Sequence, residues 1–161
     1  MADETSRVHG ATAEQRLASL GLTLPRPPGA VANYEPWAIV GSLLITSGQL
    51  PWIDGDLKFA GKVGRELSAE QGYQACRLAA LNAVAQLKAA SGDLERIRRV
   101  VRIEGTLNVA PGFTATPGVL NGASDLVNAV FGERGRHTRM LYTSADLPLD
   151  CACLIVFWAE V

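Results

Sequence analysis

The stretch Cys151-Ala152-Cys153-Leu154-Ile155-Val156-Phe157-Trp158 decides the fold, because it is a β-strand pattern that is apolar on both faces. Such a strand belongs inside a sheet with both faces covered. The rest of the chain offers only two main helices, which begin near Ser68 and Thr116, and two helices cover one face of a sheet. The simplest cover for the other face is the same sheet of another copy, which predicts a closed homo-oligomer with pockets at subunit boundaries.

The remaining strands are predicted from β-rich runs and turn residues. Residues 37–47 form a hairpin around a turn at Gly41-Ser42, and residues 57–59 form a short third strand after the Asp54-Gly55 turn. Residues 97–108 contain Val100 and Val101 in succession, which predicts a central strand. Residues 138–144 and 151–161 give the last two strands, so the expected order is ββ(β)αβαββ.

Helix boundaries follow from capping residues. Ser68 with Gln71 is a capping box, and Thr116-Pro117 predicts a cap with proline at the first helical position. Thr12 with Gln15 opens a short N-terminal helix, after which Pro25-Arg26-Pro27-Pro28-Gly29 is extended. We therefore expect residues 1–30 to form an N-terminal extension with a short helix and a proline-rich linker, and residues 31–161 to form the main domain. The extension either caps a cleft or decorates the assembly.

Composition restricts the class of protein. The chain has 161 residues, a formal net charge of −1 and 48% hydrophobic residues, which indicates one soluble domain with a sizeable core. Acidic and basic residues are interspersed, so there is no basic surface for nucleic acid. The polar N-terminus lacks the apolar segment of a signal peptide, and no apolar run has the length of a membrane span. We expect a cytoplasmic protein without nucleic-acid or membrane partners.

No cofactor is expected. Cys76, Cys151 and Cys153 are predicted to be reduced core thiols, and a zinc site would need more ligands than His9 and His137 could add. The sequence shows no Schiff-base lysine in an evident pocket, so pyridoxal phosphate is not implied as a bound group.

A set of short motifs, in order and spacing, resembles the YjgF/Rid family, also called L-PSP endoribonuclease-like, from about Ala32 to the C-terminus. These motifs are Asn33-Tyr34-Glu35-Pro36, Thr46-Ser47-Gly48-Gln49-Leu50-Pro51, Phe113, Asn121, Thr138-Arg139 and Leu147-Pro148. The resemblance implies a chorismate-mutase-like α+β fold, a mixed sheet with two main helices on one face. It also implies a homotrimer whose sheets form a central barrel, with ligand clefts between subunits. That expectation agrees with the packing argument above.

The resemblance also implies a chemistry, since the best-defined members of the family hydrolyse reactive enamines and imines. Their arginine holds the substrate carboxylate, and Arg139 occupies that place. A guanidinium suits this role because it grips a carboxylate through two parallel hydrogen bonds and stays charged. The alternative for Arg139 is a surface or intersubunit ion pair.

Four further residues match cleft positions of the family: Tyr34, Asn121, Ser47 and Gly48. From the sequence alone, Tyr34 would be a packing residue and Asn121 a helix surface residue. Ser47 and Gly48 would bring backbone close to a ligand, but a tight end of the strand explains these two residues equally well.

Two positions depart from the deaminating members. Their water-handling glutamate on the last strand corresponds here to Leu154, and the cysteine after their arginine corresponds to Leu141, which offers only a backbone carbonyl to orient water. Loss of a positioned acid-base group typically costs on the order of 10²- to 10⁴-fold in rate.

His137 is a hypothetical replacement for the missing base, because a residue two positions before Arg139 in an extended chain projects from the same face. The competing and preferred interpretation is an exposed loop histidine beside Arg134 and Arg136. Glu104 could also enter the cleft, but a pair with Arg102 on the same strand face is favoured.

The sequence leaves three functions open. The first is a Rid-like enzyme that acts on small carboxylate-bearing imines or enamines through Arg139. The second is a non-catalytic module that senses a small carboxylate in the same cleft, which Leu154 favours. The third is the endoribonuclease activity of the family's older label, ranked last because the chain shows no catalytic histidine pair, metal carboxylate cluster or basic surface.

Overall fold

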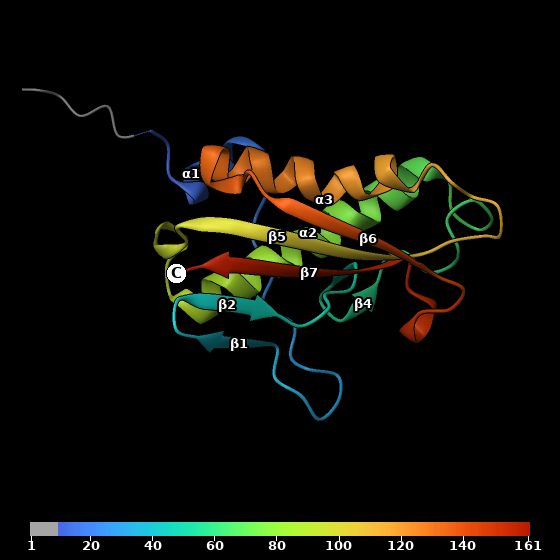
Figure 1. Ribbon diagram of the computed structural model, residues 1–161, viewed down its shortest axis with the longest axis horizontal. Helices are drawn as coiled ribbons and strands as arrows, with labels where there is room; N and C mark the ends of the chain where they lie inside the picture. Colours follow the sequence, from blue (N-terminus) through green and yellow to red (C-terminus); the bar gives the residue numbers. More distant parts are fainter. Residues whose placement is uncertain (1–9) are drawn as a thin grey trace, which may run out of the picture.

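A five-stranded mixed sheet with two long helices against it forms the core of the computed structural model, which describes residues 10–161 (Figure 1). The strand order in the sheet is β1-β2-β7-β5-β6, and a separate two-stranded hairpin, β3-β4, lies outside it. The strands are β1 (Trp37–Val40), β2 (Leu43–Thr46), β3 (Trp52–Ile53), β4 (Asp56–Leu57), β5 (Arg99–Asn108), β6 (Thr138–Ser144) and β7 (Cys153–Glu160). The helices are α1 (Ala13–Ser19), α2 (Ala69–Ser91) and α3 (Thr116–Phe131), with short 3₁₀ turns at Leu94–Arg96, Gly132–Gly135 and Pro148–Asp150.

The apolar strand β7 lies in the middle of the sheet, as its sequence predicts. It pairs antiparallel with β2 on one side and β5 on the other, and alternate residues such as Ile155 and Phe157 are fully buried. Strand β5 is also internal, and it pairs in parallel with β6, which forms an edge of the sheet. The expected fold class, a mixed sheet with two main helices on one face, is confirmed.

The capping residues set the helix starts, with one correction. Ser68 and Gln71 form the reciprocal capping box of α2, and Thr12 and Gln15 form that of α1, both as predicted. Helix α3 differs from the prediction, because its N-cap is Ala115, which makes no side-chain cap. Thr116 is already helical there, and the proline that follows it supplies the preset φ of a helix start.

Close packing of α2 and α3 on one sheet face depends on two glycines. A Cβ at Gly122 would collide with the backbone carbonyl oxygen of Tyr73 on α2, and a Cβ at Gly105 on β5 would collide with Leu120 of α3. These contacts bring α3 against both the sheet and α2, and the apolar residues between the layers are buried. Figure 1 shows α3 running along β6 while α2 crosses behind the sheet.

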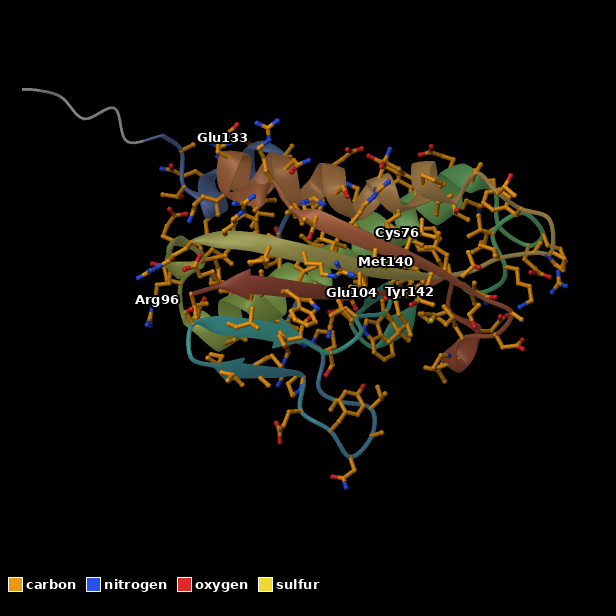
Figure 2. All side chains as sticks on the ribbon, viewed as in Figure 1. Cys76, Arg96, Glu104, Glu133, Met140 and Tyr142 are labelled. Atoms are coloured by element: carbon orange, nitrogen blue, oxygen red, sulfur yellow. The ribbon has the colours of Figure 1, made fainter. Side chains whose placement is uncertain are left out.

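The opposite sheet face has no helix against it in the described part of the chain. Met140 and Tyr142 are 42% and 44% exposed there, and Arg102 donates to Glu104 with a 2.8 Å Nε–Oε1 distance. The Arg102–Glu104 pair confirms the favoured interpretation of Glu104. Figure 2 shows Glu104, Met140 and Tyr142 together on the sheet face away from the helices.

The predicted short strand at residues 57–59 is wrong in its position. The chain instead forms the β3-β4 hairpin across the Asp54-Gly55 turn, in which Trp52 pairs with Leu57 and Ile53 with Asp56. Both turn residues have positive φ, at 52° and 85°, which suits a tight hairpin turn. Pro51 lies between β2 and β3, so the prediction that the chain leaves the first hairpin there is correct. The strand β3, which follows Pro51, was not predicted.

The N-terminal segment packs onto the domain. Ala13 and Leu17 of α1 are buried in the same hydrophobic core as α3, and Gln86 of α2 donates to the backbone carbonyl of Pro28 at 2.7 Å. The domain boundary expected near residue 30 stays a prediction, and His9 lies outside the described residues. Within residues 10–161 no helix has the length and apolarity needed to cross a membrane.

All three cysteines are buried and free, as expected for core thiols. Burial raises the pKa of the Cys151 thiol to about 11 and that of Cys153 well above its usual range. Both thiols therefore stay protonated at neutral pH and are poor nucleophiles.

We expect Gly122→Ala to reduce the free energy of unfolding by about 3 kcal/mol, because the added methyl group meets backbone rather than a side chain that could turn away. Gly118→Ala on the same helix is the matched control. A Cβ there meets nothing within 4 Å, so the substitution should stabilise by about 0.5 to 1 kcal/mol. Urea unfolding of both variants checks this, and equal stability of the two would contradict the proposed close contact.

Candidate functional site

Arg139 leaves the sheet on its helix side and lies along α3. It is the second residue of β6 and stands opposite Ile103, which is fully buried under the helices. Its Nη1 donates to Asn121 Oδ1 at 2.8 Å and to Ser124 Oγ at 3.3 Å, and its Nη2 donates to the carbonyl of Pro117 at 3.2 Å. The structure therefore brings the predicted pair Arg139 and Asn121 together.

One edge of this guanidinium is left unused. Arginine has five N–H donors, and three are committed to α3. Nε–H and one Nη2–H have no acceptor among residues 10–161, and no carboxylate in that range forms an ion pair with Arg139. Two adjacent free donors on a charged, planar group are what a carboxylate accepts in a side-on bidentate pair.

Behind Arg139, His137 and Ser124 form a hydrogen-bond chain. His137 Nε2 lies 3.0 Å from Ser124 Oγ, and His137 Nδ1 lies 2.6 Å from the carbonyl oxygen of Gly135. Ser124 is only 8% exposed. His137 is itself half-buried, so the preferred sequence interpretation, an exposed loop histidine, is wrong, because the side chain turns under β6 toward α3.

The environment of His137 favours its neutral form. Burial of the ring lowers the pKa of His137, and the charge of Arg139 lowers it further, while the hydrogen bond to the Gly135 carbonyl acts in the opposite direction. The imidazole is therefore uncharged at neutral pH.

The other predicted cleft residues form a second group. Ser47 Oγ donates to the carbonyl of Glu35 at 2.6 Å, which holds the loop that carries Tyr34 against the end of β2. Tyr34 is 44% exposed. A Cβ at Gly48 would lie 3.6 Å from the Cβ of Leu154, so Gly48 and Leu154 are direct neighbours.

Arg139 and Leu154, the neighbour of Gly48, lie on opposite faces of the sheet in one copy. Leu154 pairs with Thr106, which pairs with the exposed Tyr142 on the face without helices, whereas Arg139 is on the helix side. Gln49, next to Gly48, pairs with Ile155 of β7, so β7 and β5 separate this segment from β6. Three strand spacings amount to about 14 Å. A ligand the size of an amino acid cannot touch both groups within one chain.

Leu141 lies on the same strand face as Arg139, and its side chain packs against the hydrophobic core. It therefore contributes no polar side-chain atom to the Arg139 group. Ser124 was not predicted from the sequence, although its position three residues after Asn121 places both on one helix face. That spacing was the available signal.

A cavity of about 710 Å³ lies elsewhere, between the proline-rich segment and the β3-β4 hairpin. Pro25, Pro27, Trp52 and Asn82 line it, and Arg139 does not. Among the described residues, no three His, Cys, Asp or Glu side chains are grouped as metal ligands.

The family model described as "YjgF/chorismate mutase-like, putative endoribonuclease" matches residues 14–161. The chain belongs to this YjgF-like family. A crystal structure of a candidate endoribonuclease of the family from Shewanella oneidensis MR-1 is 49% identical, with a TM-score of 0.92, and the match covers 94% of this chain and all of that chain. Protein TCP17 of Trypanosoma cruzi is 42% identical over 137 residues, 84% of this chain and 86% of TCP17.

Other YjgF-like structures are more distant. Escherichia coli TdcF with bound serine is 21% identical, with a TM-score of 0.56, and the match covers 84% of this chain and 94% of TdcF. At that identity the likeness concerns the fold, so the serine of TdcF says nothing by itself about the ligand here.

We expect acid to destabilise the protein through His137. Because the folded state holds the pKa of His137 below its ordinary 6.5, the unfolded chain binds more protons as the pH falls through 6.5, and the free energy of unfolding decreases. The variant His137→Gln lacks this group, so its stability should fall less between pH 7.5 and pH 5. Urea unfolding at several pH values measures both proteins. Parallel curves would show that His137 has an ordinary pKa.

Proposed function

We propose that this protein binds small carboxylate metabolites in clefts between the subunits of a cytoplasmic homotrimer, with Arg139 as the anchor of the carboxylate. The observation that carries the proposal is the free Nε–H and Nη2–H edge of a guanidinium whose other donors are committed to α3. Without a ligand that edge faces no acceptor from residues 10–161. A fixed fork of this kind is specific for planar anions such as carboxylates.

The separation of the two groups supports a site shared between copies. The family resemblance assigns Tyr34, Ser47 and Gly48 to the same cleft as Arg139, yet in one chain about 14 Å lies between the segment next to Gly48 and strand β6. A second copy that brings its Tyr34–Gly48 segment to the β6 edge would complete the cleft. The uncovered sheet face, with apolar Met140, Tyr142 and Val101 exposed, is the surface that such an assembly would bury.

Two activities fit an anchored carboxylate. The first is hydrolysis of enamines or imines to keto acids and ammonia, the chemistry of the best-defined relatives. The second is binding without turnover, which Leu154 favours because a leucine in place of a carboxylate cannot take a proton from water. Glu104 does not replace it in this copy, since it is paired with Arg102.

Cleavage of RNA, which the description of the family mentions, has less support. The formal net charge is −1, and two basic side chains beside the site are already in ion pairs, Arg136 with Glu133 and Arg134 with Glu95. Tight binding to RNA at physiological salt with a steep salt dependence would reverse this ranking.

We expect Arg139→Ala to weaken binding of pyruvate about 100-fold or more, because two charge-assisted hydrogen bonds are lost. Calorimetric titration measures the affinity. Release of keto acid from 2-aminoacrylate, generated in place by a serine dehydratase, separates the two activities. Arg139-dependent acceleration identifies a deaminase, and binding without acceleration identifies a sensing module. Arg136→Ala is the control, an exposed arginine nearby that is paired with Glu133. Equal affinity of wild type and Arg139→Ala would contradict the anchor.

A mixed assembly tests the shared cleft. Arg139→Ala removes the anchor. Gly48→Leu places a large side chain beside Leu154, in the half of the cleft that the second copy supplies. Neither variant alone should therefore bind pyruvate. Refolding the two together should restore about one quarter of the sites, those that join two intact halves. No recovery, with the assembly shown to mix, would place both groups in one chain's site and contradict the proposal.

A further inference from the structure

Ser124 and His137 form a pair behind Arg139, on the side of the guanidinium that faces α3. We infer that this pair consists of positioning residues that fix which edge of Arg139 is presented to the carboxylate. The inference rests on the proposed role of Arg139 as a carboxylate anchor, and it assigns a function to Ser124, which the family resemblance does not include.

The direction of each hydrogen bond in the chain is determined. The carbonyl oxygen of Gly135 can only accept, so His137 Nδ1, 2.6 Å away, must carry a proton. Because the imidazole is neutral, its Nε2 is then bare and can only accept. The hydroxyl of Ser124, 3.0 Å from Nε2, is therefore the donor in that contact.

With its proton held by His137, Ser124 can offer only lone pairs to Arg139. Its Oγ accepts from Nη1 at 3.3 Å, and Nη1 uses its second proton on Asn121 at 2.8 Å. The hydrogen bond from Nη2 to the carbonyl of Pro117 is the third contact between the guanidinium and α3. The three acceptors lie at positions 117, 121 and 124, along one face of a single helix, so they fix the plane of the guanidinium.

The consequence is an orientation for the substrate. Both Nη1 protons and one Nη2 proton are held by α3, so the donors that remain for a ligand are Nε–H and the other Nη2–H. A carboxylate therefore binds side-on to these two donors, for which no residue in 10–161 supplies an acceptor. Ser124, 8% exposed and on the far side of the guanidinium, does not reach such a ligand.

This placement separates two roles for His137. As a general base it would contribute to turnover and not to carboxylate binding. As a positioning residue, it acts on binding, because without an acceptor at Nε2 the Ser124 hydroxyl can rotate its proton toward Arg139 and lose the Nη1 contact. The geometry favours the second role, since Nε2 is engaged by Ser124 rather than open to water.

The experiment compares Ser124→Ala, His137→Leu and His137→Gln, with pyruvate as the probe. Ser124→Ala and His137→Leu should each weaken pyruvate binding about 10-fold, the value of one hydrogen bond. His137→Gln should restore most of the affinity, because its amide oxygen can accept from Ser124. Ser91→Ala is the matched control, a serine 7% exposed on α2 with hydrogen bonds only to backbone carbonyls. It should leave the affinity unchanged.

A spectroscopic readout tests the same inference without ligand. The ¹⁵N spectrum of wild type should show His137 with a protonated Nδ1 and a bare Nε2, and the Arg139 Nη groups should give separate signals because rotation is restrained. In Ser124→Ala the Arg139 signals should merge while the fold, followed by the amide spectrum, is retained. Restrained Arg139 signals in Ser124→Ala, or pyruvate affinity equal to wild type, would overturn the positioning role.

The two proposals fail differently. Absence of Arg139-dependent pyruvate binding in wild type would remove the carboxylate anchor, and the Arg139 spectrum would still decide whether Ser124 and His137 hold the guanidinium. Normal binding in both Ser124→Ala and His137→Leu would leave the anchor intact and remove the positioning pair.

Discussion

The contact between Gly122 and the Tyr73 carbonyl fixes α3, and the candidate site depends on where α3 lies. A side chain at position 122 would separate the two long helices, and one at Gly105 would lift α3 from the sheet. With both glycines in place, the apolar side of α3 is buried and its Pro117, Asn121 and Ser124 meet Arg139. A packing requirement at the centre of the domain thus sets the geometry of a polar group at its edge.

Much of the fold could be predicted because its signals are local or periodic. The two capping boxes, the hairpin turn at Gly41-Ser42 and the apolar pattern of β7 each depend on residues close in sequence. The β3-β4 hairpin was missed because its two strands have only two residues each, too few for alternation to be visible. The burial of His137 was missed because it depends on α3 lying alongside β6, a contact between two separate elements of the fold.

The residues of the candidate site also differ in how far the sequence predicts them. Arg139 was identified through its motif, while its partner Ser124 has no motif and becomes meaningful only when helix and strand are placed together. The family resemblance points to Arg139 as the proposed anchor but does not give the chemistry, since fold and reaction are separate properties. The 49% identity to the Shewanella protein supports close kinship. The 21% identity to TdcF supports only a shared architecture.

The distance between the two groups of cleft residues has a thermodynamic consequence. A ligand held by Arg139 of one copy and by the Gly48 segment of another binds only the assembled form. By mass action, such a ligand strengthens the assembly, and dilution of the protein lowers its apparent affinity for the ligand. Subunit concentration and metabolite concentration would then act on one equilibrium, so that the metabolite itself helps to hold the oligomer together.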